Sequence, residues 1–348
     1  MIKRVIYFFL LAGCAVQFFG CRKDNPEDKQ QVKFTTGISG GVFITNEGNF
    51  QFGNAKVSYY DNASATAVED LFQPANNISL GDVCQSMYLF NGKAYVVVNN
   101  SGKIVVVNPK TFVQETVISG MGSPRYFLPV SNNKAYVTDL YANAVSIVDL
   151  NGNIKTGTIA CSGWTEEMAL VYGKVFVTNE KSNKVYVINT ANDAMEDSIQ
   201  VGFNSNSIRQ DKNGKLWVLC SGNQKNNIPG SLHRIDPITK QVEQSFQFSN
   251  TTDSPWKLRM NATNDTLYFL NNSVFRMAIG AANLPSTAFI SNGKSVFYGL
   301  GIDPKNGVIY ISDAIDYVQR GAIYRYKSDG TLINTFKAGI APGDFCFN

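Results

Sequence analysis

The sequence predicts an all-β protein, a seven-bladed β-propeller closed by a C-terminal strand that pairs into the first blade. Three observations support this fold class. The composition is 12% aromatic and only 17% charged, with 29 glycines, and this balance favours strands over helices. A strand pattern with a central aromatic residue recurs seven times. The last residues of the chain resemble the opening strand of a blade, which the first blade lacks.

The repeated strand is an aromatic residue within a β-branched run that ends in a polar residue. It occurs as GVFITN, KAYVVVN, KAYVTD, KVFVTN, KLWVLC, TLYFLN and VIYISD, with aromatics at Phe43, Tyr95, Tyr136, Phe176, Trp217, Tyr268 and Tyr310. Successive aromatics are 52, 41, 40, 41, 51 and 42 residues apart. Such a period is typical of the four-stranded units that form propeller blades.

A further strand follows each of these, as VSYYD, IVVVN, VSIVD, VYVIN, LHRID, VFRMA and IYRYK. The first five end in Asp or Asn, at Asp61, Asn108, Asp149, Asn189 and Asp236. This ending suits a turn, because the side chain can bond the backbone just beyond it. A third, more variable strand comes next, for example QETVI and QVEQSFQF.

The two long gaps are interpreted as insertions rather than extra blades. The first comprises 49–54 and a loop around 73–80, and the second comprises 224–230 with 250–254.

Closure of the ring can also be predicted. The repeat begins at Gly41 with the second strand of a blade, so blade one lacks its innermost strand. Residues 343–348 resemble Gly81 to Cys84, which open blade two, and we therefore expect Cys84 and Cys346 at equivalent positions. Pairing of the C-terminal strand into blade one would remove two open sheet edges.

The N-terminus reads as a lipoprotein signal peptide. Lys3 and Arg4 precede an uncharged run from Val5 to Gly20, which is too short for a membrane span. Both Cys14 and Cys21 fit a lipobox, and Cys21 is favoured because it leaves a full-length apolar region and a polar tether directly after it. An unlipidated secretory signal is the alternative. The predicted organisation is a signal at 1–20, lipidated Cys21 with a flexible tether at 21–40, and the propeller at 41–348.

Composition and side-chain inventory exclude several function classes. The mature chain would carry a charge of about +2 with no basic block, which argues against a nucleic-acid partner. His233 is the single histidine, so a Ser-His-Asp triad and histidine-built metal centres are not expected. The cysteines after the signal, Cys84, Cys161, Cys220 and Cys346, show no close metal-ligand spacing. We therefore expect no metal, no catalytic cofactor and no enzyme activity.

A binding surface is better supported. In a propeller, the loops that join the second strand to the third, and those that lead into the next inner strand, gather around one end of the central channel, here called the mouth. Amide and aromatic side chains dominate the predicted mouth, and its candidate ligand-binding residues are Asn46, Glu47, Phe50, Gln85, Arg125, Tyr126, Tyr141, Glu166, Asn179, Trp256, Tyr298, Asp316 and Tyr317.

Turn formation is the competing explanation for the Asn and Asp members of this set, because these residues favour turns for backbone reasons alone. Aromatic rings in loops can likewise pack between blades. Phe50, Tyr141 and Tyr317 nevertheless fall where polar residues are the usual choice, which favours a binding role. The mouth suits a wide, neutral, amide-bearing ligand whose ring is covered by aromatic faces.

The chain resembles the BtuG family in several runs. These are 41–50 (GVFITNEGNF), Gly81-Asp82 with Gln85-Ser86-Met87, Ser123 to Tyr126, Tyr298 to Leu300, Ser312 to Tyr317, and Tyr324 to Tyr326 with Gly343 and Phe345-Cys346. The resemblance spans nearly the whole mature chain, although the strand pattern itself is shared with many YncE-like propellers.

The resemblance implies a seven-bladed surface lipoprotein of the Bacteroidota outer membrane. Such a protein captures cobalamin or related corrinoids and passes them to a TonB-dependent transporter of the BtuB type. The charged residues Arg22, Lys23, Asp24, Glu27 and Asp28 look like the tract that directs such lipoproteins to the cell surface. A surface propeller that binds another nutrient or a partner protein is the alternative, and a propeller enzyme such as a lactonase or lyase is the least favoured.

Overall fold

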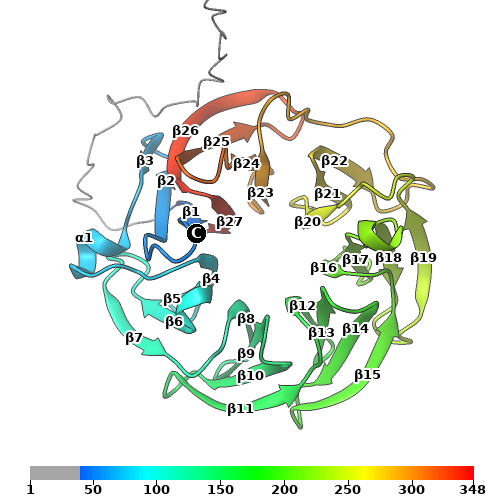
Figure 1. Cartoon of the computed structure of the whole chain (residues 1–348), viewed down its shortest axis with the longest axis horizontal. Coiled ribbons are helices and arrows are strands. Elements are labelled where there is room, and N and C mark those ends of the chain that lie inside the picture. Colours follow the sequence, from blue (N-terminus) through cyan, green and yellow to red (C-terminus); the bar gives the residue numbers. More distant parts are fainter. Residues whose placement is uncertain (1–39) are drawn as a thin grey trace, which may run out of the picture.

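The computed structural model describes residues 40–348, which form a ring of seven antiparallel sheets around a central channel (Figure 1). The predicted signal peptide and its cysteines, Cys14 and Cys21, lie outside the described residues. Six sheets have four strands, and the sixth blade along the chain has three. The predicted seven-bladed propeller is therefore confirmed.

The strands fall into four concentric sets. The inner strands are β27 (Pro342–Phe347), β4 (Cys84–Phe90), β8 (Pro124–Ser131), β12 (Thr165–Val171), β16 (Ser205–Gln210), β20 (Trp256–Met260) and β23 (Phe297–Ile302). The second strands are β1 (Gly41–Asn46), β5 (Lys93–Val98), β9 (Lys134–Asp139), β13 (Lys174–Asn179), β17 (Leu216–Cys220), β21 (Thr266–Asn271) and β24 (Ile309–Asp313). The third strands are β2 (Lys56–Asp61), β6 (Lys103–Val107), β10 (Ala144–Asp149), β14 (Lys184–Asn189), β18 (Ser231–Ile235), β22 (Ser273–Ala278) and β25 (Arg320–Tyr326). The outer strands are β3 (Thr66–Val68), β7 (Gln114–Ile118), β11 (Ile154–Ala160), β15 (Ala194–Gln200), β19 (Val242–Gln247) and β26 (Leu332–Ile340).

The seven repeated aromatics all lie on second strands and are buried between neighbouring blades. Phe43, for example, packs with residues of blades one and two, and Tyr95 packs with residues of blades two and three. The hydrophobic core is thus a series of inter-blade layers. Burial of one large side chain per interface, repeated around the ring, explains why the aromatic recurs at blade spacing.

The C-terminal strand closes the ring as predicted. β27 pairs antiparallel with β1, with Ile44 opposite Phe345, and the two lie side by side in Figure 1 although they come from opposite ends of the described chain. The expected equivalence of Cys84 and Cys346 is wrong. Cys84 begins β4, whereas β27 begins at Pro342 and Cys346 is its fifth residue. The resemblance between the two segments is therefore out of register by four residues.

Two other local expectations need correction. The predicted loop around residues 73–80 contains a short helix, α1 (Phe72–Asn76), anchored by the buried ring of Phe72. Blade six has no outer strand, and only an isolated bridge joins Val274 to Ile290. Pro285 lies in this stretch, and proline cannot donate to a strand ladder.

Two one-turn helices, η1 (Asn99–Ser101) and η2 (Gln224–Asn226), lie in mouth loops. No helix within residues 40–348 is long and apolar enough to cross a membrane.

Candidate functional site

Every inner strand begins with a β-bulge at the mouth. In all seven blades the pairing with the second strand shifts by one residue near this end, for example between Thr165 and Met168 of β12 and between Trp256 and Arg259 of β20. A bulge interrupts the alternation of side chains along a strand and redirects the extra residue. The seven bulges therefore place additional side chains around the channel.

The upper layer of the channel consists of Arg125, Glu166 and Gln85. Arg125 Nε donates to Glu166 Oε1 at 2.7 Å, and Arg125 Nη1 donates to Gln85 Oε1. Glu166 is only 2% exposed. Burial raises the pKa of the Glu166 carboxyl to about 8, although Arg125 acts in the opposite direction. These predicted residues come together from blades two, three and four.

Two further carboxyl groups and an ammonium face the same centre. Tyr298 Oη donates to Glu47 Oε1 at 2.8 Å. Burial raises the pKa of Glu47 and of Glu180, and Arg125 and Lys257 oppose both shifts. Lys257 is 8% exposed, and its ammonium makes no hydrogen bond or ion pair with another residue of the described range.

Lys257 also has a left-handed backbone with φ of +57°, which is unfavourable for a lysine. It occupies the β20 bulge, between Trp256 and Arg259. Strained backbone of this kind is retained where the surrounding structure fixes it, often at functional sites. Lys257 was not among the predicted site residues, although a lysine next to a tryptophan at the start of an inner strand could have indicated it.

Aromatic side chains flank this polar centre on two sides. On one side, the rings of Trp256 and Tyr298 are 5.1 Å apart and those of Tyr298 and Tyr317 are 5.2 Å apart. On the other side, Tyr141 meets Trp164 edge-on at 5.8 Å. Tyr141 is 65% exposed. Trp256, Tyr298 and Tyr317 thus form one group, and Tyr141 forms a second group with Trp164.

The loop between β1 and β2 extends the first aromatic group. Asn49 Nδ2 donates to the backbone oxygen of Tyr317 at 3.0 Å, which fixes this loop against blade seven. Phe50 is 62% exposed and Phe52 is 77% exposed in the same loop. Exposed rings of this size are unusual unless a ligand or partner covers them.

Three predicted residues hold the loops in place. Asn46 and Asn179 are fully buried. The Asn46 amide bonds the backbone of Ile44, Lys56 and Gly339, and Asn179 Nδ2 donates to the backbone oxygen of Ser162 at 2.5 Å. Asp316 is exposed, and its carboxylate accepts from the backbone of Val318 and Gln319 at 2.9 Å. The side chains of these three residues therefore bond the backbone of loops and turns, as the turn-forming explanation expects.

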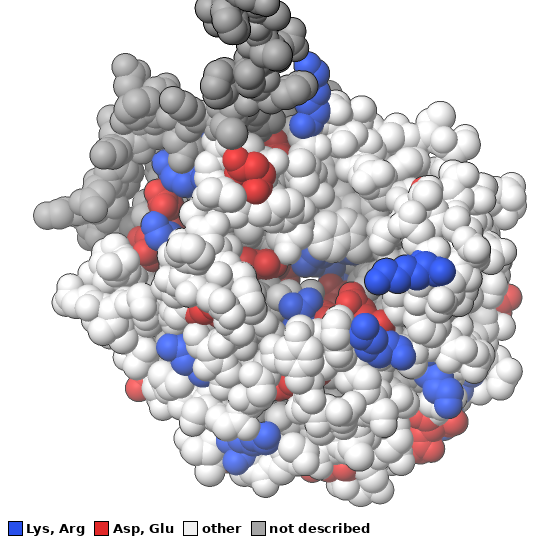
Figure 2. Space-filling model, in the orientation of Figure 1, with Lys and Arg blue, Asp and Glu red and all other residues white. Residues whose placement is uncertain are grey.

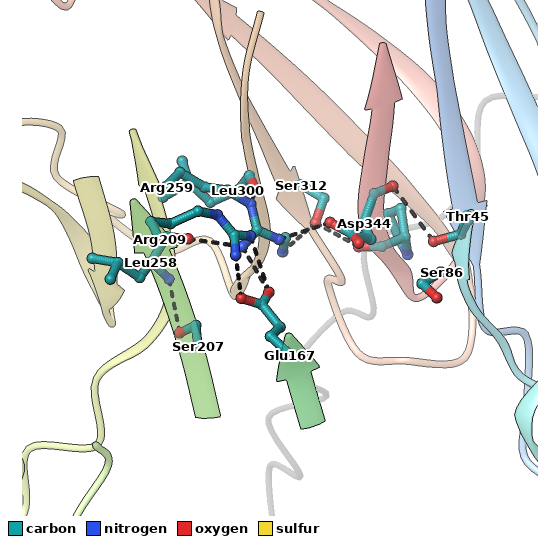
Figure 3. A network of polar contacts seen from close by, with 12 residues as sticks. Thr45, Ser86, Glu167, Ser207, Arg209, Leu258, Arg259, Leu300, Ser312 and Asp344 are labelled. Atoms are coloured by element: carbon teal, nitrogen blue, oxygen red, sulfur yellow. Dashed lines mark hydrogen bonds and ion pairs between the residues drawn. The ribbon is translucent and has the colours of Figure 1, made fainter. Parts of the chain in front are cut away.

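A lower layer of charge crosses the channel beneath the first, and Figure 3 shows the polar contacts of this lower layer. Arg209 Nη1 and Nη2 donate to Glu167 Oε2 and Oε1 at 2.5 and 3.1 Å. Arg259 Nη1 donates to Glu167 Oε1 at 2.9 Å, and Arg259 Nη2 donates to Asp344 Oδ1 at 2.8 Å. Burial by itself would raise the pKa of Glu167, but Arg209 and Arg259 hold it below its usual value. Blades four, five and six are thereby tied to the closing strand.

Tyr126, predicted for the mouth, instead lines a cavity that the residues of this lower layer also line. Glu167, Arg209, Arg259 and Asp344 were not among the predicted site residues. Two consecutive charged residues in a strand pattern, Glu166-Glu167, could have indicated that both side chains face the channel. Figure 2 shows basic and acidic side chains together around the central hollow of the face in view, with others scattered toward the rim.

His233 lies within blade five and has a packing role. Its Nε2 accepts from the backbone N–H of Gly202 at 2.9 Å, and Nδ1 lies 2.9 Å from Ser245 Oγ. Burial lowers the pKa of His233 to about 4.

The four cysteines within the described residues, Cys84, Cys161, Cys220 and Cys346, are free thiols. No group of three or more His, Cys, Asp or Glu side chains among the described residues could hold a metal ion.

Solved structures with similar architecture show the fold alone, because their identities are low. A quinonprotein alcohol dehydrogenase-like protein from Bacteroides thetaiotaomicron is 15% identical, with a TM-score of 0.70. The match covers 88% of this chain and 78% of that protein. A protein from Lactobacillus plantarum is 13% identical, with a TM-score of 0.69, and the match covers 89% of this chain and 100% of that protein. A dihydro-heme d1 dehydrogenase, NirN, in complex with DHE is 9% identical, with a TM-score of 0.61, and the match covers 88% of this chain and 75% of that protein.

Among curated proteins, none matches the chain in sequence. The model of one family, described as a domain of unknown function (DUF5074), matches residues 40–339. The match covers the propeller from the residue before β1 to the next-to-last residue of β26, and the chain therefore belongs to the DUF5074 family.

Proposed function

We propose that the chain is a ligand-binding surface propeller that captures cobalamin or a related corrinoid in its mouth. The observation that carries the proposal is the arrangement of two aromatic groups on either side of a polar centre. Trp256, Tyr298 and Tyr317 form one group, and Tyr141 and Trp164 form the other. A wide ring that bears peripheral amides would contact both groups at once.

The polar centre suits amide groups better than ions of one sign. Lys257 and Arg125 can donate to amide oxygens, while Glu180 and Glu47 can accept from amide N–H groups. The raised pKa of Glu166 lets its carboxyl retain a proton near neutral pH and donate as well. Mixed donors and acceptors around a neutral ligand avoid the cost of burying an unpaired charge.

Several blades must contribute to tight binding. Burial of about 200 Å² on one aromatic ring contributes at most about 5 kcal/mol at about 25 cal/mol per Å². A nanomolar complex requires roughly 12 kcal/mol after the costs of ordering. Both aromatic groups and the polar centre are therefore needed together.

In this proposal the protein acts at the cell surface. Lipidation of Cys21 would anchor the chain in the outer membrane with the propeller at the cell surface, and a TonB-dependent transporter of the BtuB type would receive the ligand. The corrinoid is a transported ligand in this proposal, with no catalytic cofactor and no enzyme activity.

The direct test is binding of cyanocobalamin to the lipid-free chain from Val32 to Asn348, by calorimetry and by comigration on a sizing column. We expect saturable heat and comigration at micromolar concentrations. Absence of both would overturn corrinoid capture.

A partner protein is the second candidate occupant of the mouth, because Phe50 and Phe52 expose large apolar rings in the loop that Asn49 bonds to Tyr317. Failure of cyanocobalamin binding, together with crosslinking of a transporter to a probe at Phe52, would favour this function instead.

A further inference from the structure

A cavity of about 550 Å³ lies in the half of the channel opposite to the mouth. Residues of all seven inner strands line it, together with Asn261, Asn264 and Pro304 in the turns that leave β20 and β23. Its volume falls within the range of small-molecule sites in proteins. The mouth aromatics do not line this cavity, so it is separate from the site proposed above.

The charged part of its lining is electrically balanced. Arg209 and Arg259 carry two positive charges, and Glu167 and Asp344 carry two negative charges in the ion pairs of Figure 3. Glu167 is 4% exposed at its side chain. An anion entering the cavity would meet these carboxylates as well as the guanidinium groups, so the lining offers no net attraction for negative charge.

Unused hydrogen-bond donors remain on Arg209. Its Nη1 donates to Glu167 and to the backbone oxygen of Ile208, and its Nη2 donates once to Glu167. An arginine has five N–H donors, so Nε–H and one Nη2–H have no partner within residues 40–348. The side chain is 28% exposed, which leaves these donors open to an incoming acceptor.

Part of the remaining wall is apolar and adaptable. Met87, Met168 and Met260 line it together with Phe345 and Phe347. Thioether and aromatic side chains of this kind make favourable contacts with flat rings, and methionine adjusts to irregular shapes. The Tyr126 phenol supplies a further donor, because burial raises its pKa well above the usual value and it keeps its proton.

We propose that this cavity is a second binding site, for a small uncharged ring compound that carries a carbonyl acceptor. The ring would lie against the methionine and phenylalanine side chains, and the carbonyl oxygen would accept from the free donors of Arg209. The inference does not depend on what binds at the mouth.

The test compares 2-naphthamide with 2-naphthoate, which share one ring system and differ in charge. We expect 2-naphthamide to bind the purified protein with a dissociation constant below about 1 mM by calorimetry. We expect 2-naphthoate to bind at least about tenfold more weakly. Binding of neither probe would overturn the proposal, and tighter binding of 2-naphthoate would show an anion site instead.

Variants locate the probe. Met260→Trp, or Met168→Trp if the first variant does not fold, fills the cavity and should abolish binding, whereas Tyr317→Ala at the mouth should leave it unchanged. Arg209→Met should weaken 2-naphthamide about tenfold but leave naphthalene, which has no acceptor, unaffected. Binding that survives in whichever tryptophan variant folds, or an equal loss of 2-naphthamide and naphthalene binding in Arg209→Met, would overturn the assignment.

Discussion

Glu166 and Glu167 are neighbours in β12, yet their carboxylates belong to different levels of the channel. Glu166 pairs with Arg125 at 2.7 Å beside the mouth, and Glu167 pairs with Arg209 and Arg259 below it. Adjacent residues of a regular strand point to opposite faces. The bulge between Thr165 and Met168 removes this constraint, and one strand thereby serves both layers.

The lower layer is expected to contribute strongly to stability. Glu167→Gln leaves the half-buried Arg209 without an acidic partner and the buried Arg259 with Asp344 alone, and loss of one partner of a buried ion pair costs about 3 kcal/mol. Urea unfolding measures this loss. The surface variant Glu196→Gln, which interrupts a pair with Lys240 at 2.8 Å, is the control and should change stability far less. Equal losses for the two variants would contradict the assigned role.

Stability should fall as pH rises between about 4.5 and 8 because of Glu166. Its pKa is about 8 in the folded chain and 4.5 is its ordinary value, so across this window the folded state holds more protons than the unfolded state. Burial is the main cause, and Glu166→Gln removes the titrating group. The free energy of unfolding, measured by urea from pH 5 to 8, should decline more steeply in the unaltered protein than in Glu166→Gln. Parallel curves would refute the raised pKa.

The ring itself could be predicted because each blade repeats one local pattern. Phe43, Tyr136 and Tyr310 occupy the same position in their second strands, so the spacing alone gave the blade number. The closing strand was also predictable, since β1 is a second strand without an inner neighbour earlier in the described chain. The register of that strand was not, because the resemblance of 343–348 to 81–84 matches Cys346 to Cys84, whereas the pairing with the second strands places Cys346 level with Tyr88.

The candidate site was predictable to the level of its loops but not of its side chains. Gln85, Arg125 and Glu166 converge as expected, since all three follow a blade-to-blade connection. The roles of Asn46 and Asn179 depend on backbone groups of distant or turning segments, which sequence spacing does not reveal. Tyr126 was misplaced because a bulge, rather than simple alternation, decides which level of the channel it lines.

Deletion of residues 343–348 should give insoluble or protease-sensitive protein. The deletion removes the pairing of β27 with β1 and the bond from Arg259 to Asp344, and it exposes one edge of β1. Solubility, limited proteolysis and thermal melting report the effect. An unchanged melting temperature would refute closure by this strand.

Lys257 should act in binding through its charge and its donors. With cyanocobalamin as the ligand, Lys257→Met should weaken affinity about tenfold, which corresponds to about 1.4 kcal/mol for one lost hydrogen bond from a charged donor. Lys257→Arg keeps a positive donor and the same backbone requirement, and should retain most of the affinity. Calorimetry of the three proteins decides the matter. An equal loss in both variants would indicate that only the shape of the bulge matters.

The exposed aromatics at the mouth should act in binding rather than in packing. Phe50 and Tyr317 are 62% and 44% exposed, so their truncation in Phe50→Ala with Tyr317→Ala removes little buried area. We expect cyanocobalamin affinity to fall at least about tenfold, with a small change in melting temperature. Tyr172→Ala is the matched control, because Tyr172 is 67% exposed in the turn between β12 and β13, at the opposite end of the blade. If the double variant loses stability but keeps its affinity, the two rings are packing residues, and the ligand must be held by Tyr141, Trp164 and the polar centre instead.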